Sequence, residues 1–218
     1  MNIAVCIPYR PSHEDRVQNF ACVRKEWDQR EIPIFTADSL GERWDRAQAV
    51  NRAVAQASMA DVILVSDSDI LLEEPFAQTK RACEVALERN AYVVAFTSLL
   101  YLDTEGTVVV REGWAVPGQS IFWDQTNIWG GVFAIPKSLW DEIGGFDERF
   151  QGYGAEDQGF LVCASTLGGE KARIPGRAFH LDHPEQAKGD FSANKALAKR
   201  YLDADGDREA VLEIMAER

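Results

Sequence analysis

The feature that most constrains this chain is a run of four apolar residues, 62–65, that ends two residues before the first of two carboxylates, Asp67 and Asp69. Three of the four are β-branched, which predicts a strand buried on both faces. In open α/β sheets the carboxyl ends of such strands line the ligand crevice. Asp-x-Asp at such a place can hold a divalent cation, which in turn binds a diphosphate. A polar turn after a buried strand is the alternative interpretation.

The elements around this strand alternate between strand and helix. Apolar runs predict strands over residues 3–7, 32–36, 62–65 and 92–97, and apolar residues at helical spacing predict helices over 13–29, 42–59 and 75–90. Pro75 suits a first helical turn, where its missing N–H costs nothing. This order predicts an α/β fold with a mainly parallel central sheet, flanked by helices and joined by right-handed crossovers.

The alternation stops in a long segment, residues 98–128. It contains one short strand-like run, 107–110, together with Trp114 and Trp123, and Trp129 lies just beyond it. Loops of this length are usually functional or disordered, and the aromatic content disfavours disorder. We therefore expect a flap that orders over a bound donor. Tryptophan faces commonly stack on sugar rings, but packing in the core is the default interpretation for each of these tryptophans.

The second half of the chain is divided by glycine pairs. Gly130 and Gly131 open a predicted strand that reaches residue 135, and their small size lets a ligand approach the backbone closely. Further glycine pairs at 144–145 and 168–169 end helices predicted over 136–143 and 158–167. Short strands are predicted over 172–175 and 178–181, followed by a charged helical tail over about 187–218.

Polar side chains at the ends of these elements are candidate site residues. Arg10 and Arg16 follow the first strand, where each could contact a phosphate or lie in solvent. Asp38 follows the second strand, which suits a bond to a nucleobase or ribose, or a helix cap. Glu156 and Asp157 fall in a helix's first turn, where the dipole keeps a carboxylate ionised, as a general base or simply to stabilise the helix.

Length, charge and cysteine content narrow the class of protein. A chain of 218 residues suggests a single domain, and its net charge of −12 argues against a broad nucleic-acid surface or an anionic membrane partner. The four cysteines lie far apart without metal-type spacing, which indicates reduced thiols in a reducing compartment. No membrane span or signal-peptide pattern is present, so we expect a cytoplasmic protein.

Four segments, taken in order, resemble the glycosyltransferases of the nucleotide-diphospho-sugar (GT-A) fold, in particular the inverting β-1,4-galactosyltransferase and chondroitin-polymerase-like branch (family 2-like). They are residues 7–10, residues 46–51, the Asp-x-Asp at 66–69, and the block 129–157 with its Gly-Gly-Phe and Glu-Asp, with Phe179-His180 downstream. The resemblance covers about residues 3–184. One departure is Ala155, where the family has glycine, which we expect to narrow the space for the acceptor.

The resemblance implies a metal-dependent transfer of a sugar from a nucleotide-diphosphate donor, such as a UDP-sugar, to an acceptor hydroxyl with inversion. Asp157 would act as the base and Glu156 would orient the acceptor. Asp69 and His180, with Asp67 at the ribose or in the metal shell, would hold Mn²⁺ or Mg²⁺. The residues expected at the nucleotide are Pro8, Tyr9, Arg10, Asp38, Arg46, Asp67, Gly130 and Gly131.

Several alternatives stay open on sequence grounds. His183 competes with His180 for the ligand role, and either histidine could be structural. The acceptor could be a glycan, a small molecule or a lipid-linked sugar; the acidic charge disfavours a modified nucleobase. A retaining transferase shares this outline. A nucleotidyltransferase would usually show a glycine-rich basic loop after the first strand, where residues 8–11 read Pro-Tyr-Arg-Pro. A non-catalytic carbohydrate binder would be expected to lack Asp69 or Asp157.

We divide the chain into a transferase domain, 1–186, with a nucleotide-binding half (1–97) and an acceptor half (98–186), and a tail (187–218).

Overall fold

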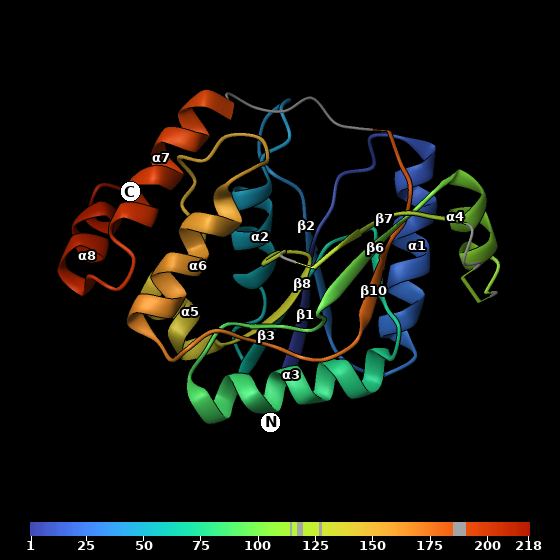
Figure 1. Cartoon of the computed structure of the whole chain (residues 1–218), viewed down its shortest axis with the longest axis horizontal. Coiled ribbons are helices and arrows are strands. Elements are labelled where there is room, and N and C mark those ends of the chain that lie inside the picture. The colour runs from blue at the N-terminus through green and yellow to red at the C-terminus, as the bar shows by residue number, and fades with distance from the viewer. Residues whose placement is uncertain (114, 117–119, 127, 185–190) are drawn as a thin grey trace.

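The computed structural model describes residues 1–113, 115–116, 120–126, 128–184 and 191–218 (Figure 1). The strands are β1 (Ile3–Pro8), β2 (Ile34–Ala37), β3 (Val62–Ser66), β4 (Ile70–Leu72), β5 (Val93–Val94), β6 (Ser98–Leu102), β7 (Ile121–Gln125), β8 (Val132–Pro136), β9 (Ala172–Arg173) and β10 (Arg177–His180). The helices are α1 (Glu14–Asp28), α2 (Arg46–Val54), α3 (Pro75–Arg89), α4 (Thr104–Arg111), α5 (Lys137–Ile143), α6 (Glu156–Leu167), α7 (Phe191–Asp203) and α8 (Arg208–Ala216).

The larger of two sheets has the strand order β2-β1-β3-β8-β5-β9. β1 pairs in parallel with β2 and β3, and β5 pairs in parallel with β9, whereas β8 runs antiparallel to both β3 and β5. Every residue of β3 is buried, as its apolar run predicts. In Figure 1 this sheet lies between α1 on one side and α2, α5 and α6 on the other. The predicted α/β fold with a mainly parallel central sheet is confirmed, with β8 as the reversed strand.

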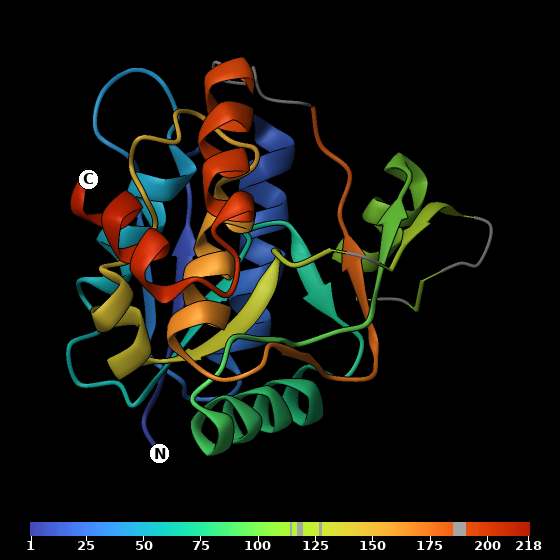
Figure 2. The same ribbon diagram turned by 60° about the vertical axis from the view of Figure 1, so that its left-hand side comes forward.

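A smaller sheet, β4-β10-β6-β7, stands beside the larger one. β10 runs antiparallel to β4 and parallel to β6, and β7 runs antiparallel to β6. Figures 1 and 2 show β7 and α4 on the side of the molecule away from α8. The pairing of Ile70 with His180 brings the end of β10 beside the Asp-x-Asp turn, because Ile70 directly follows Asp69.

Three sequence predictions are corrected. The helix predicted over 42–59 spans only α2, because the side chain of Asp45 accepts a bond from the Gln48 N–H and caps the helix there, so Trp44 lies outside it. The strand-like run 107–110 lies in α4, whose N-terminus is capped by Asp103. The strand predicted over 92–97 is reduced to β5, and β6 starts only at residue 98. Trp114 and residues 187–190 of the predicted tail lie outside the described residues.

The tail packs on the body of the protein. Tyr201 of α7 and Val211 of α8 are fully buried in the same apolar cluster as β1 and β3. All four cysteines are free thiols. None of the helices in the described part of the chain combines the length and apolar character needed to cross a bilayer.

Candidate active site

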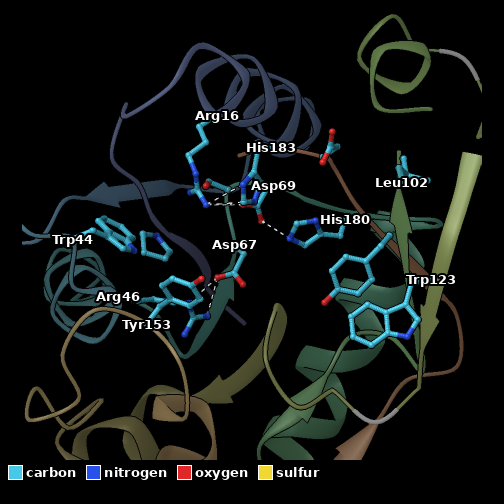
Figure 3. Close-up of a pocket in the computed structure, with 14 residues that line it drawn as sticks. Arg16, Trp44, Arg46, Asp67, Asp69, Leu102, Trp123, Tyr153, His180 and His183 are labelled. Atoms are coloured by element: carbon cyan, nitrogen blue, oxygen red, sulfur yellow. Dashed lines mark hydrogen bonds and ion pairs between the residues drawn. The ribbon is translucent and has the colours of Figure 1, made fainter. Parts of the chain in front are cut away.

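A cavity of about 450 Å³ opens where β1 and β3 end beside the small sheet. Figure 3 shows its walls, with Trp44 and Trp123 at opposite ends and Asp67 and Asp69 between them. The lining residues are Pro8, Arg16, Trp44, Arg46, Asp67, Ser68, Asp69, Tyr101, Leu102, Trp123, Tyr153, His180, Asp182 and His183. The cavity therefore combines both acids of the Asp-x-Asp with both candidate histidines.

Asp69 lies between two imidazoles. His183 Nε2 is 3.0 Å from Asp69 Oδ2, and His180 Nε2 is 3.9 Å from Asp69 Oδ1. One ligand atom from each of these residues can be chosen so that all three lie within 4.8 Å of one another. The backbone fixes this geometry, since the Leu181 N–H donates to the Asp69 carbonyl over 2.8 Å. His183, the second candidate in the sequence, therefore stands beside Asp69 together with His180.

The protonation states of Asp69 and His180 suit a divalent cation. Burial opposes ionisation of Asp69, but the hydrogen bond from His183 and the charges of both histidines and Arg16 hold its pKa well below the usual range. Burial lowers the pKa of His180, which favours the neutral imidazole that a metal requires. One carboxylate and two imidazoles fit Mn²⁺, while Mg²⁺ prefers oxygen ligands.

His183 is oriented by its own surroundings. Its Nδ1 lies 2.9 Å from the carbonyl oxygen of Pro184, which can only accept, so Nδ1 carries a proton. This leaves Nε2 directed at Asp69. Burial lowers the pKa of His183, but the hydrogen bond and charge of Asp69 outweigh it and raise the pKa overall. A metal ion at Nε2 must displace a proton, so binding should weaken as the pH falls.

Arg46 joins the Asp-x-Asp to the Glu-Asp pair. Its Nη2 is 2.8 Å from Asp67 Oδ1, and its Nη1 is 3.0 Å from Asp157 Oδ1 and 3.3 Å from Glu156 Oε1. Arg46 is 8% exposed, so these pairs lie in a largely desolvated environment. The sequence places Arg46 at the nucleotide; in the structure its guanidinium faces three carboxylates at the edge of the cavity.

Glu156 lies beneath this cluster. It is 4% exposed, accepts a hydrogen bond from the Gly154 N–H and does not appear among the lining residues of the cavity. Burial and the neighbouring Asp157 charge raise its pKa to about 7, against the opposing effect of Arg46. Burial likewise raises the pKa of Asp67 to about 6, with Arg46 opposing. The position of Glu156 suits control of Arg46 and Asp157 better than direct contact with an acceptor.

Gly130 makes room for Asp157. A Cβ atom built on Gly130 would lie 2.3 Å from Asp157 Oδ2, so any side chain there would displace the carboxylate. Gly131 adopts φ +87°, and its carbonyl accepts the Asp67 N–H over 2.9 Å. The glycine pair thus shapes the backbone between Asp67 and Asp157, where the sequence predicts close approach of a ligand.

The candidate nucleotide residues divide into two groups. Pro8 lines the cavity, whereas Tyr9 stacks on Phe20 with ring centroids 3.9 Å apart. Arg10 Nε donates to both oxygens of Asp38, at 2.8 and 2.9 Å. The structure therefore pairs Arg10 with Asp38, and both lie outside the described lining of the cavity.

One wall is an aromatic row that joins Trp123 and His180, both candidates from the sequence, through Tyr101, which the sequence analysis did not single out. Tyr101 stacks on His180 at 4.7 Å and on Trp123 at 4.9 Å between centroids, because strand pairing places the three side by side. Trp123 is 51% exposed at the outer end of this aromatic row. Tyr153 lines the same cavity. The sequence offered one signal for Tyr101, its position within an apolar run. Its stacking partners could not be predicted, because they lie in distant segments.

Comparison with known proteins identifies the architecture. Residues 121–184 match the family described as the N-terminal domain of galactosyltransferase. The catalytic domain of Drosophila β1,4-galactosyltransferase 7, solved with xylobiose, superposes with a TM-score of 0.55 at 17% identity, over 91% of this chain and 79% of that one. The chain has the GT-A fold. The predicted resemblance to the galactosyltransferase branch is confirmed.

Two further GT-A structures extend the likeness. The mannosyltransferase PcManGT from Pyrobaculum calidifontis, in complex with GDP-Man and Mn²⁺, gives a TM-score of 0.53 at 13% identity, over 99% of this chain and 68% of that one. GalNAc-T7, solved with UDP, GalNAc and Mn²⁺, gives a TM-score of 0.59 at 12% identity, over 99% of this chain and 54% of that one. The family match and this shared fold together support a glycosyltransferase that uses a nucleotide sugar.

Proposed function

We propose that this GT-A protein transfers a sugar from a UDP-sugar to a hydroxyl of a saccharide acceptor, with inversion at the anomeric carbon. The observation that carries the proposal is the cavity lined by Asp69, His180 and His183 and by Arg46, whose guanidinium is bonded to Asp157. Residues 1–97 supply the nucleotide side of the site, residues 98–186 the acceptor side, and residues 187–218 the tail.

Asp69, His180 and His183 would hold Mn²⁺, and Asp67 the donor ribose or a water in the metal shell. When bound, the cation offsets the charge that grows on the diphosphate as the glycosidic bond breaks. A mutant of the Drosophila enzyme was solved with manganese, UDP-Gal and xylobiose, which supports a UDP-sugar and a saccharide as partners here.

Asp157 serves as the general base. Its carboxylate is 29% exposed and adjoins the cavity through Arg46, whose Nη1 bonds its Oδ1 over 3.0 Å, while its Oδ2 is directed toward Gly130. The acceptor hydroxyl gives its proton to Asp157 as its oxygen attacks the anomeric carbon from the face opposite the leaving diphosphate. A single displacement needs one base, which favours inversion.

The aromatic row supports a sugar as the acceptor. Tyr101 lines the cavity with its ring stacked between His180 and Trp123, and the exposed Trp123 at the end of this row suits the apolar face of a pyranose. In Figure 3, Trp123 lies at the end of the cavity away from Trp44. We place the nucleotide toward Trp44 and the acceptor toward Trp123.

The test is a screen of UDP- and GDP-sugars for Mn²⁺-dependent release of the nucleotide, repeated with Asp157→Asn and with an oligosaccharide panel that includes xylobiose. Asp157→Asn should reduce transfer by roughly 10²- to 10⁴-fold while donor affinity changes little, since a base acts on the transition state. Glu209→Gln, which also removes a charge from a helix's first turn but lies in α8, is the matched control. A folded Asp157→Asn variant with wild-type transfer would refute the assignment.

A further inference from the structure

Helix α4 lies in the segment predicted to be a flap, yet it is bonded to the loop that carries His183. That loop, residues 181–184, follows β10 and is joined to the Asp-x-Asp by the bond from Leu181 to Asp69 described above. On its other side, each hydrogen bond described for Asp182 is made with a side chain of α1 or α4. The contacts of Asp182 therefore help to place His183, together with Arg16 Nη2, which lies 3.3 Å from His183 Nε2.

Three polar groups of Asp182 are each held by a different side chain. Its backbone N–H donates to Thr107 Oγ1 over 2.7 Å, and its carbonyl accepts from Asn19 Nδ2 over 3.1 Å. Its carboxylate accepts from Thr104 Oγ1 over 2.6 Å. Thr107 is 2% exposed and Asn19 is fully buried, so the two backbone bonds are shielded from competing water.

Helices α1 and α4 are also bonded to each other behind this loop. Arg111, in the last turn of α4, donates to Asn19 Oδ1 over 2.8 Å, to Gln18 Oε1 over 2.7 Å and to the Asp15 carbonyl over 3.0 Å. Asn19 thus receives a bond from α4 and gives one to Asp182. The result is a continuous set of hydrogen bonds from Arg111 to the residue that precedes His183.

We propose that Thr107, assisted by Thr104 and Asn19, is a positioning residue for the metal site: it fixes the backbone of Asp182 and so holds His183 against Asp69. This inference rests on the proposed function only in requiring that Asp69, His180 and His183 bind a divalent cation. Partners behind metal ligands typically change metal affinity by about 10- to 100-fold when removed. Helix α4 is then a fixed support of the metal site, and any movement of the segment 98–128 that displaces α4 weakens the metal site.

The experiment is calorimetric titration of the full chain with Mn²⁺ alone. Thr107→Val keeps the side chain's shape but removes the acceptor for the Asp182 N–H, so Mn²⁺ affinity should fall about 10-fold or more. Thr107→Ser, which restores the hydroxyl, should return the affinity close to wild type. The milder Thr104→Val, which removes only the bond to the carboxylate of the half-buried Asp182, should weaken binding in the same direction, and it tests the idea if Thr107→Val does not fold.

Thr166 offers a matched control, because its Oγ1 accepts the Gly206 N–H over 3.1 Å far from the cavity. Thr166→Val should lower the melting temperature and leave Mn²⁺ affinity unchanged. The positioning role is refuted if Thr107→Val and Thr104→Val bind Mn²⁺ like wild type, or if Thr166→Val loses as much affinity as they do. Absence of Mn²⁺ binding in the wild-type protein would instead overturn the metal site itself, and this inference with it.

Discussion

Replacing Arg46 should destabilise the protein in a strongly pH-dependent way. Arg46 is the cation shared by Asp67, Glu156 and Asp157, and Arg46→Met keeps its length while removing the charge. Breaking a buried ion pair by removing one partner typically costs about 3–5 kcal/mol, because the remaining charges stay buried without compensation. That cost applies only where the carboxyl groups are ionised.

The pKa values give the direction of the pH effect. Burial raises the pKa of Glu156 from 4.5 to about 7, and at about 1.4 kcal/mol for each pH unit this corresponds to about 3 kcal/mol. The folded state holds its proton more tightly than the unfolded state does, so its stability falls as the pH rises from about 4.5 through 7. Asp67, whose pKa is raised to about 6, follows the same sign. Without Arg46 both pKa values rise further, so the loss of folding stability continues to higher pH.

The assay is urea unfolding with a chelator present, at pH 5 and pH 8. At pH 5 Glu156 and Asp67 are mostly protonated, so Arg46→Met loses only the pair with Asp157 and should cost less than at pH 8. At pH 8 it should cost about 3–5 kcal/mol, or roughly 6–20 °C in melting temperature for a chain of this size. Arg52→Met removes an exposed arginine of the same helix, whose side chain among the described residues bonds only the Asp38 carbonyl, and the change should stay within about 0.5 kcal/mol at both pH values. An equal cost of Arg46→Met at pH 5 and pH 8 would contradict the reasoning.

Three further outcomes are expected. Asp69→Ala should abolish Mn²⁺-dependent donor binding. If calorimetry gives the Asp69→Ala variant the same donor affinities as the wild type, both with and without chelator, the metal assignment is ruled out. Trp123→Ala should raise the KM for a saccharide acceptor roughly 3- to 10-fold, from the loss of about 0.5–1.5 kcal/mol of ring contact, with donor hydrolysis unchanged and Trp123→Phe nearly normal. Ala155, at φ +73°, adopts a left-handed conformation that costs a non-glycine residue about 1–2 kcal/mol. Ala155→Gly should therefore stabilise the protein. The gain is up to about 1 kcal/mol, because glycine relieves the strain but also increases the conformational entropy of the unfolded chain. A lower midpoint of urea unfolding would disprove this.

Much of the fold follows from local patterns. The apolar run 62–65 specifies a wholly buried strand, and Pro75 marks the first turn of α3, as the structure shows. The valines at 108–110 misled the prediction because β-branched residues favour strands, whereas the Asp103 cap and the exposure of Val108 belong to a surface helix. Here the tertiary position of the segment outweighs its intrinsic preference.

The site could be predicted only as a set of residue types. The acids and histidines stand out because they follow apolar runs, and the structure places Asp69, His180 and His183 together. The partners of Arg46 could not be predicted, since an arginine on a helix looks the same whether it faces a phosphate or carboxylates 21 and 110 residues away. Thr107 and Asn19 give no signal at all, because their role depends on a backbone group of a distant loop.

The contact between Gly130 and Asp157 provides a criterion for sorting related sequences. Because a Cβ at position 130 would overlap the carboxylate, the glycine and the aspartate are expected to be inherited as a pair. In a relative that keeps the metal-binding acids but carries alanine at the position of Gly130, the aspartate must take another side-chain position, so its transfer activity should be tested before it is grouped with the transferases. A survey of genomes could apply this two-residue criterion before any protein is expressed.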